Sequence, residues 1–517
     1  MTPPAVDHPP TRPTTGSLIA SMFRRGPAQR VLHLTWFAFF LTFVAWFNFA
    51  PFATTIGGQF DLSTGQLVTL GLCNLALTVP ARLVVGSLLD RFGPRRTFSA
   101  ILLYATVPCL LFATAQSFEV LVLSRLLMGV VGAGFVVGIR MVAEWFPPAE
   151  VGTAEGIYGG WGNFGAAAAA LTLPAVAGAV GGPAGWRWAV AGTGVVAGLY
   201  GLAYLRLVRD TPDGTPYARA RRAAALEVTS RGAVWGLIAM SVPLAGALVV
   251  IAWRIFHVGV ISAGALGVAV AASLVLLALQ VTSVWRVNER ARTSTYPSGQ
   301  RYPFRSVAVL SFAYACTFGS ELAAVSFLPE FFETTWGLSA AVAGAAAAAF
   351  AVMNLVSRPG GGLLSDLVAS RRRWLSVLLG GLGVGYLVLS QLSSAWPLWL
   401  ALVAVLVTSV FAQAGNGAVY AIVPLVRRQA SGQVSGLCGA YGNVGGIVFL
   451  TVLVVSSART AFLVMGVASL CAFVASRWLV EPSASHAAAP SPEPDGAAVS
   501  EDPVVAGPVP VGAAVGR

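Results

Sequence analysis

The chain has 517 residues, of which 56% are hydrophobic and 10% are charged. Soluble domains carry about 25% charged residues, so this composition excludes an ordinary soluble protein and indicates a protein that crosses a membrane many times. The net charge of +12 requires no nucleic-acid partner, because such membrane proteins collect arginine in their cytoplasmic loops.

The two ends of the chain have the composition of tails. Residues 1–30 are polar and rich in proline, and they lack the short apolar core and cleavage site of a signal peptide. Residues 481–517 are acidic and rich in alanine, proline and serine, a composition that cannot bury a core. We therefore predict disordered cytoplasmic tails over 1–30 and 481–517.

Apolar stretches long enough to cross a bilayer, about 20 residues each, come in groups of six, two and six. The first group covers 32–57, 66–89, 97–116, 119–142, 153–180 and 186–207. The middle pair covers 233–253 and 258–284, and the last group covers 305–330, 338–364, 373–393, 396–424, 432–456 and 459–480. We predict an all-α membrane protein of fourteen spans: a six-helix bundle over 31–208, a linker with an inserted two-helix hairpin over 209–304, and a second six-helix bundle over 305–480.

The arginine-rich loops predict the orientation of the chain. If the spans alternate in direction, these loops fall on one side of the membrane, together with both termini. The positive-inside rule makes this side cytoplasmic. We therefore expect a multi-pass protein of the cell membrane with both termini in the cytoplasm.

The two groups of six spans repeat each other. Arg82 and Asp90 return 276 residues later as Arg358 and Asp366, and the string Gly-Asn-x-Gly that starts at residue 162 returns 280 residues later. Parallel repeats of six spans, related by an axis along the membrane normal, are typical of major facilitator transporters. The repeat therefore predicts the major facilitator fold, with two bundles related by pseudo-twofold symmetry.

Arg82 and Arg358 each lie in the middle of an apolar, membrane-length stretch. A charge near the centre of a bilayer costs roughly 3 kcal/mol on insertion scales, so a buried arginine indicates a function. Two guanidiniums that face each other across a pseudo-twofold axis would bind a small anion. Asn163 and Asn443 occupy matching points of glycine-rich spans and offer N–H donors to an oxyanion, although a buried asparagine can also bond only within its helix bundle.

The loop after the second span, GSLLDRFGPRR, resembles the loop signature of the major facilitator superfamily. Asp90 is expected to accept hydrogen bonds from helix N-termini of the other bundle, and Arg91 to pair with Glu144, so that both close the cytoplasmic side. The second copy keeps Asp366 but has Leu367 in the place of Arg91, so we expect its gate to be weaker. The alternative is that these charges only mark the membrane boundary.

A more specific resemblance rests on the paired glycine-asparagine strings, on the arginine-x7-aspartate spacing of spans two and eight, and on GIRMVAEWFPP and GNGAVYAIVP. Together they resemble the NarK-like nitrate/nitrite porter family of the major facilitators, over roughly 30–208 and 305–480. The resemblance implies that Arg82 and Arg358 clamp the planar anion. A guanidinium offers two parallel N–H donors to a trigonal oxyanion, which a lysine ammonium cannot.

The same resemblance implies further anion contacts. It places Asn163 at the asparagine of the fifth span, and it places Tyr314, Phe318 and Phe135 at the aromatic rings that sandwich the anion. Aromatic residues at helical spacing are also common in plain packing, and this alternative stays open.

The chain departs from the family pattern in its inserted hairpin, in Arg140 and in Glu321. Arg140 and Glu144 are one helical turn apart and can pair with each other. Glu321 follows Phe318 by three residues on the same helix face, and it is either a proton carrier for coupled uptake or a structural group. The histidines cannot carry the proton, since all four lie in tails, loops or span ends.

The sequence thus predicts a nitrate/nitrite transporter that works by alternating access, as a monomer in the lipid bilayer. It is compatible with nitrate/nitrite exchange and with proton symport. We expect no cofactor and no metal, since the five cysteines form no CxxC pair and have no histidine at ligand spacing. We expect no enzymatic activity, because no nucleophile is paired with a base. The alternatives are a carrier of another small anion, and a membrane-embedded sensor.

Overall fold

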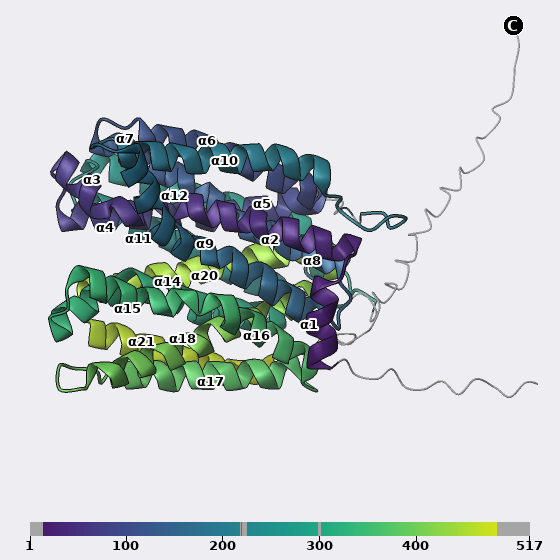
Figure 1. Ribbon diagram of the computed structural model, residues 1–517. Helices are drawn as coiled ribbons and strands as arrows, with labels where there is room; N and C mark the ends of the chain where they lie inside the picture. Colours follow the sequence, from purple (N-terminus) through teal and green to yellow (C-terminus); the bar gives the residue numbers. More distant parts are fainter. Residues whose placement is uncertain (1–13, 218, 220–224, 298–300, 483–517) are drawn as a thin grey trace, which may run out of the picture.

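The computed structural model describes residues 14–217, 219, 225–297 and 301–482, and helices dominate it (Figure 1). The first bundle consists of α2 (Pro27–Trp46), η1 (Ala50–Phe52), α3 (Ala53–Phe60), α4 (Thr64–Ala76), α5 (Thr78–Phe92), α6 (Pro94–Ala113), α7 (Phe118–Met128), η2 (Gly129–Ala133), α8 (Gly134–Trp145), α9 (Val151–Val180) and α10 (Gly185–Leu207). The linker holds α11 (Arg231–His257), α12 (Ala263–Val287) and α13 (Glu289–Thr293). The second bundle consists of α14 (Phe304–Trp336), α15 (Ala340–Val352), α16 (Asn354–Leu367), α17 (Arg371–Leu389), α18 (Leu398–Tyr420), α19 (Val423–Val426), η4 (Arg428–Ala430), α20 (Ser431–Val455), α21 (Ala458–Ala475) and η5 (Ser476–Trp478).

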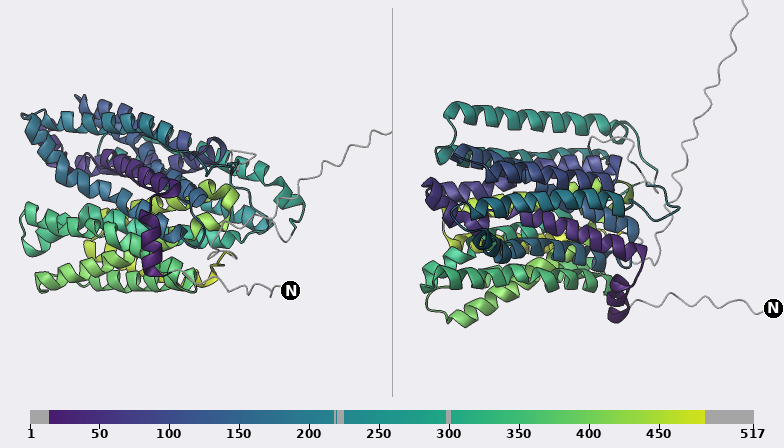
Figure 2. Two further views of the ribbon diagram at one scale, coloured as in Figure 1. Left: turned by 45° about the vertical axis from the view of Figure 1, so that its right-hand side comes forward. Right: turned by 45° about the horizontal axis from the view of Figure 1, so that its top comes forward.

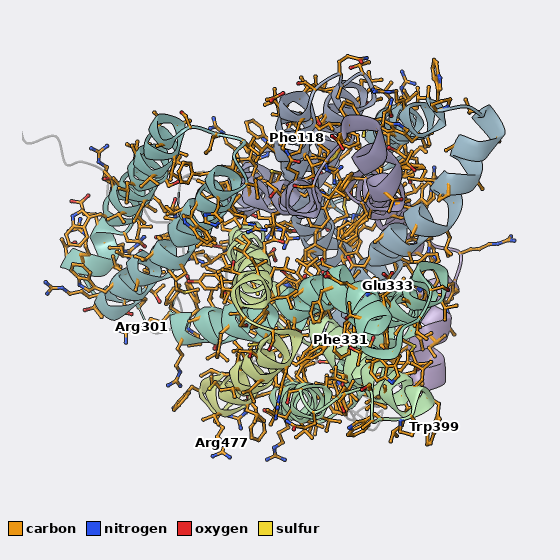
Figure 3. The ribbon with its side chains drawn as sticks, turned by 90° about the vertical axis from the view of Figure 1, so that its left-hand side faces the viewer. Phe118, Arg301, Phe331, Glu333, Trp399 and Arg477 are labelled. Carbon is orange, nitrogen blue, oxygen red and sulfur yellow. The ribbon has the colours of Figure 1, made fainter. Side chains whose placement is uncertain are left out.

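Within the described residues, fourteen helices or runs of consecutive helices are long and apolar enough to cross a membrane. They follow the order six, two and six, so the predicted spans are confirmed. Seen from one end in Figure 3, the two bundles lie next to each other, with Phe118 in the first and Phe331 and Trp399 in the second. The helices of the linker lie along the edge that the two bundles share.

The second span of each bundle is broken into two helices, and each arginine of the repeat lies in the second piece. The break falls at Leu77 between α4 and α5, and at Met353 between α15 and α16. Proline explains the irregularity in α16, because Pro359 has no N–H to donate to the carbonyl of Leu355. That carbonyl instead accepts a hydrogen bond from Trp161 Nε1 of α9 in the other bundle, at 3.3 Å.

Glycines allow the two bundles to approach closely. Helix α9 packs along α16, and α20 packs along α5, each across the boundary between the bundles. A Cβ atom at Gly156 would lie 2.7 Å from Cα of Pro359, and one at Gly436 would lie 2.5 Å from the carbonyl oxygen of Arg82. Only glycine fits at such backbone-to-backbone contacts, as expected for spans rich in small residues.

At one end of the molecule the two bundles draw together, and we call this end the arginine-rich end (Figure 2, left). It holds the connections from α5 to α6, α8 to α9, α16 to α17 and α19 to α20, and the described residues 208–217 and 225–230 between α10 and α11. Helix α1 (Thr15–Phe23) lies across this end and contacts both α9 and α16. The prediction of disorder over 1–30 is therefore wrong for this segment, because Leu18 and Met22 are buried and Thr14 caps the helix. Residues 1–13 and 483–517 lie outside the described residues, so the remainder of both predicted tails stays a prediction.

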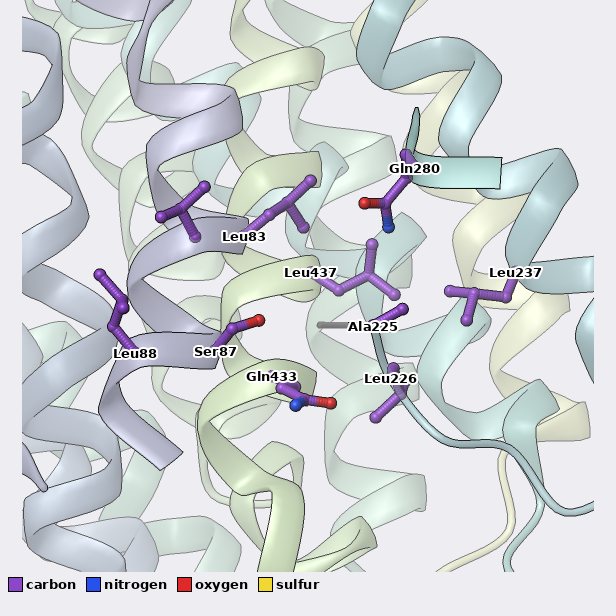
Figure 4. A pocket seen from close by; sticks show the side chains of 10 residues that line it. Leu83, Ser87, Leu88, Ala225, Leu226, Leu237, Gln280, Gln433 and Leu437 are labelled. Atoms are coloured by element: carbon purple, nitrogen blue, oxygen red, sulfur yellow. The ribbon is translucent and has the colours of Figure 1, made fainter. Parts of the chain in front are cut away.

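The inserted hairpin consists of α11 and α12. Helix α11 packs against α4 of the first bundle and against α14 and α20 of the second, and Tyr441 of α20 donates a 2.8 Å hydrogen bond to the carbonyl of Met240. Helix α12 packs on α11, and within it Ser273 and Val284 are buried. A pocket with a volume of about 160 Å³ lies between α5, α20 and the hairpin, and Leu83, Leu237 and Gln280 are part of its lining (Figure 4).

Candidate anion site

Arg82 lies on α5 and is completely buried. Its Nε donates to the carbonyl of Gly132 at 3.3 Å, and its Nη1 donates to the carbonyl of Gly439 in the second bundle. Its guanidinium carbon lies 5.5 Å from the ring centroid of Phe135 and 5.5 Å from that of Phe318. The remaining nitrogen, Nη2, has no hydrogen-bond partner among the described residues. Arg82 is therefore fixed in place with one donor group to spare.

Arg358 lies on α16 and is 1% exposed. Its guanidinium carbon lies 5.1 Å from the ring centroid of Phe135, the same ring that Arg82 faces. Its Nε, Nη1 and Nη2 are all buried, and none has a hydrogen-bond partner among the residues that the structure describes. Burying a guanidinium without hydrogen-bond acceptors costs free energy, and a bound anion would supply the missing acceptors.

Each arginine reaches across the boundary to a glycine of the opposite bundle. A Cβ at Gly159 of α9 would lie 2.5 Å from Arg358 Nε, and one at Gly439 of α20 would lie 3.2 Å from Arg82 Nη1. These two glycines are 280 residues apart, so they are partners in the repeat. The glycine-rich spans therefore make room for the arginines as well as for the neighbouring backbones.

A group of stacked rings lies beside the two guanidiniums. Tyr314 stacks on Phe318 with a centroid distance of 5.0 Å, and on Phe135 with a centroid distance of 6.1 Å. Tyr420 meets the rings of Tyr314 and Phe135 edge-on, at 4.8 Å from each. The structure thus brings the three predicted aromatic residues together with both arginines, and it adds Tyr420, which we did not predict. The ring faces attract cations, here the two guanidiniums, and they can pack against other planar groups.

The two asparagines of the repeat lie one helical turn beyond the glycines that face the arginines. Asn163 follows Gly159 by four residues on α9, and Asn443 follows Gly439 by four residues on α20. Asn163 Oδ1 and both amide atoms of Asn443 are buried, without a hydrogen-bond partner in the described part of the chain. A buried amide without partners costs free energy, which supports a ligand role and disfavours simple packing.

Glu321 is buried on α14, where two amides hold it. Asn354 Nδ2 donates to Oε1 at 2.6 Å, and Asn416 Nδ2 donates to Oε2 at 2.6 Å. The carboxylate also lies within electrostatic reach of Arg358. Donors on both oxygens stabilise the ionised form of a carboxyl group.

A second buried carboxyl group near Arg358 was missed by the sequence analysis. Glu155 lies on α9, one turn before Gly159, and is 1% exposed. Arg358 lies within its electrostatic reach, and neither of its oxygens has a hydrogen-bond partner among the described residues. The available signal was its position in TAEGIYGGWGN, at two turns from Asn163, but the residue lies close to the predicted end of the span.

Asp90 joins the first bundle to the second at the arginine-rich end. Its Oδ1 accepts from the backbone N–H of Gly432 at 3.1 Å, and its Oδ2 accepts from that of Gln433 at 2.9 Å. These N–H groups belong to the first turn of α20, whose positive dipole end attracts a carboxylate. The geometry is the one expected for Asp90 as a contact to a helix N-terminus across the boundary.

Asp366 makes the equivalent contact from the second bundle, with more partners. It accepts from the backbone N–H groups of Gly152 and Thr153 at 3.0 and 2.6 Å, and from the Thr153 hydroxyl at 2.7 Å. Arg371 Nη1 lies 2.7 Å from its Oδ1, and Arg371 also donates to the carbonyl of Pro148. The expectation of a weaker second gate followed from Leu367 alone, whereas the partner of Asp366 comes from the start of the next helix.

The expected pair of Arg91 with Glu144 is replaced by another. Glu144 lies 2.6 Å from Nη2 of Arg140, one turn earlier on α8. Arg91 is exposed, and its guanidinium lies over the ring of Phe92. The pair forms within the helix because the two side chains share a face, while Arg91 points outward from α5. Arg140 also donates to the carbonyl of Arg428 and to the Ser431 hydroxyl, so this pair still links the two bundles.

Known proteins resemble this chain over most of its length. Residues 35–293 and 310–514 match the model of the Major Facilitator Superfamily. The nitrate/nitrite transporter NrtP of Nostoc punctiforme is 50% identical over 483 residues, which cover 91% of this chain and 96% of that protein. The NrtP of Picosynechococcus is 48% identical, with the same coverage of both chains. The high affinity nitrate transporter 2.5 of Arabidopsis thaliana is 28% identical over 86% of this chain and 78% of its own length.

The chain belongs to the nitrate/nitrite porter family of the major facilitator superfamily.

Solved structures support the fold of this porter. The human organic anion transporter MFSD10 aligns with a TM-score of 0.59 at 15% identity, over 87% of this chain and all of that one. The proton:xylose symporter XylE aligns with a TM-score of 0.59 at 14% identity, over 88% and 96%. The predicted major facilitator fold, the family and the expectation that the porter is not an enzyme are therefore confirmed. The roles of its site residues stay predictions.

Proposed function

We propose that this chain carries nitrate and nitrite across the cell membrane by alternating access, with Arg82 and Arg358 as the anion ligands. One observation carries the assignment of the ligands. Two buried guanidiniums, one from each bundle, lie over the same ring of Phe135, and four of their nitrogens have no hydrogen-bond partner among the described residues. Relatives with about half of their residues identical are described as nitrate/nitrite transporters.

The shape of the site favours a small planar anion. The guanidinium fork presents parallel N–H donors in one plane, and nitrate and nitrite match it with two oxygens. Tyr314 stacks on Phe318 with an interplanar angle of 1° and on Phe135 with an angle of 5°, so these rings offer parallel flat faces to such an anion. Asn163 and Asn443 would supply further N–H donors. The backbone at Gly159 and Gly439 lies close to the two guanidiniums, which leaves little room for a bulkier substrate beside either arginine.

The gate contacts define the state of the molecule in this proposal. By the positive-inside rule the arginine-rich end is cytoplasmic. Helix α1 and Glu481, which accepts a hydrogen bond from Ser370, lie at this end. Asp90 and Asp366 then hold the cytoplasmic side closed by bonding to the first turns of α20 and α9. To open this side, the transporter must break both sets of bonds, and an anion bound between the arginines would move with the bundles.

The transport proposal is tested by counterflow in proteoliposomes. Vesicles loaded with nitrite are diluted into isotopically labelled nitrate, and accumulation of the label is followed with and without a pH-sensitive dye inside. We expect the label to accumulate when nitrite or nitrate is inside, and not when phosphate or gluconate is inside. Counterflow that phosphate supports as well as nitrite does would contradict the assigned substrate class.

We expect Gly159→Ala to weaken nitrate binding strongly and Gly439→Ala to weaken it less. The new methyl group at 159 would lie 2.5 Å from Arg358 Nε and must displace the guanidinium, whereas the one at 439 would lie 3.2 Å from Arg82. A displaced fork loses a charge-assisted hydrogen bond, so the loss at 159 should reach ~1.5–3 kcal/mol. Isothermal titration with nitrate measures it.

The control for this comparison is Gly178→Ala on the same helix, because nothing lies within 4 Å of a Cβ at that position. It should bind nitrate like the parent. If Gly159→Ala bound nitrate as tightly as Gly178→Ala does, Arg358 would not bind the anion in the position that it occupies beside α9.

A further inference from the structure

The charges buried around Arg358 are not balanced in the same way as those around Arg82. Arg82 is held by two backbone carbonyls, and the repeat partner of Glu155 on α20 is the uncharged Ser435. Among the described residues no carbonyl accepts from the Arg358 guanidinium, which instead lies near two buried carboxyl groups, Glu321 and Glu155. Glu155 lies one turn before Gly159, where a Cβ would be 2.5 Å from Arg358 Nε. The two arginines of the site therefore differ in their surroundings, and only Arg358 of the second bundle lies near buried carboxyl groups.

The two carboxyl groups differ in their surroundings. Glu321 accepts one amide N–H on each oxygen, and both hydrogen bonds favour its ionised form. Glu155 is equally buried, yet no donor among the described residues reaches either of its oxygens. A buried carboxylate with no donor depends on a nearby positive charge, and without that charge the neutral acid is the stable form.

The groups around Glu155 leave Arg358 as its charge partner. The helices packed on α9 bring several titratable or charged side chains to its vicinity: Arg358 and Asp366 on α16, Arg140 and Glu144 on α8, Tyr204 on α10, Tyr420 on α18 and His33 on α2. Among these, Arg140 pairs with Glu144, and Asp366 pairs with Arg371. Arg358 lies against α9 beside Glu155, since a Cβ at Gly156 would lie 2.9 Å from its carbonyl oxygen and one at Gly159 would lie 2.5 Å from its Nε. Tyr158 of the same helix is a titratable neighbour of Glu155.

We propose that Glu155 is the proton-binding residue that couples proton movement to anion movement in this transporter, an inference that rests on the proposed function. Without an anion, Glu155 and Glu321 as carboxylates balance the two arginines of the site. When nitrate binds Arg358, it takes over the positive charge that Glu155 depends on. Glu155 then takes up a proton from water and becomes a neutral acid, so that the loaded site is neutral again.

The position of Glu155 also provides a route for release. Glu155 lies two residues after Thr153, whose backbone N–H and hydroxyl bond to Asp366 at the closed arginine-rich end. When this end opens, these bonds break and the first turns of α9 meet water. The neutral acid then becomes hydrated, loses its proton on this side, and regains Arg358 as its partner as the anion leaves.

The coupling makes nitrate binding depend on pH. Because the complex holds a proton that the free site lacks, affinity should rise as the pH falls, by up to about tenfold per pH unit until Glu155 is protonated without nitrate. Purified protein in a weakly buffered solution with a pH dye should take up about one proton per bound nitrate. Nitrate affinity is measured in parallel by titration calorimetry over a pH series.

Four variants decide the assignment. Glu155→Gln should bind nitrate with an affinity that no longer depends on pH and should take up no proton, while nitrate/nitrite counterflow continues. Glu155→Asp keeps the carboxyl group and should retain the pH dependence. Glu321→Gln should still take up a proton, and Glu330→Gln, an exposed glutamate on the same helix, should match the parent.

The outcomes separate the two proposals. A parent protein that does not bind nitrate overturns the proposed function. A parent that binds nitrate without proton uptake, or a Glu155→Gln variant that takes up protons as the parent does, overturns the role of Glu155 and leaves the anion site standing. Loss of proton uptake in Glu321→Gln alone would place the proton on Glu321.

Discussion

Replacing Arg358 by lysine should weaken nitrate binding by ~1–3 kcal/mol, which is roughly 10- to 100-fold in affinity. Lysine keeps the charge but loses the fork, and it offers a point charge where two oxygens of a planar anion expect two donors. The loss of nitrate affinity in Arg82→Lys should be smaller, because two nitrogens of Arg82 already donate to backbone carbonyls. Isothermal titration of purified protein with nitrate and nitrite gives both values.

Arg373→Lys is the matched control, since Arg373 is exposed at the arginine-rich end. It should change neither affinity nor melting temperature. Unaltered nitrate affinity in a well-folded Arg358→Lys protein would remove Arg358 from the binding site. The inferred role of Glu155 would then lose its basis as well.

Asp366→Asn should open the arginine-rich end far more than Asp90→Asn does. The change leaves Arg371, which is fully buried, without its carboxylate, and breaking a buried ion pair costs ~3–5 kcal/mol. The transporter can avoid this cost by opening and hydrating Arg371, so the closed state loses population. Asp90→Asn removes two bonds to backbone N–H groups and strands no buried arginine that pairs with it.

The measurement uses a cysteine at Ala421, which is buried at this end and lies 3.0 Å from the Cβ position of Gly152. In a background with Cys471→Ser, the four remaining cysteines are buried. The rate at which a membrane-impermeant thiol reagent modifies Ala421→Cys should rise with Asp366→Asn and much less with Asp90→Asn. Equal rates would contradict this prediction, and a faster rate with Asp90→Asn would agree with the sequence-based expectation of a weaker second gate.

Much of the site could be predicted because it depends on patterns that survive in one dimension. Apolar stretches and their repeat placed Arg82 and Arg358 at equivalent depths, and the structure brings both to the ring of Phe135. The aromatic positions followed from a family resemblance. Their mutual stacking depends on how α8 and α14 face each other, which no spacing along the chain encodes.

The remaining features could not be predicted, for reasons that differ from one to the next. Glu144 lies four residues after Arg140, so this pair forms more readily than one with Arg91 on another helix. Glu155 was missed because nothing along the chain shows that its turn of α9 meets Arg358 of the other bundle, as the contact at Gly159 does. Helix α1 was missed because its nine residues are too few to span a membrane and follow a polar, proline-rich segment.

The hydrogen bond between Trp161 and the carbonyl of Leu355 has a consequence for how the bundles can tilt. It joins α9 to α16 at the depth of the arginines, between Gly159 and Asn163, and so lies far from both mouths of the transporter. When two bundles tilt about a common point, atoms near that point hardly separate, whereas atoms at the ends of the bundles move far apart. In the proposed alternating-access cycle, the hydrogen bond of Trp161 can therefore stay formed while the two ends of the bundles open and close in turn.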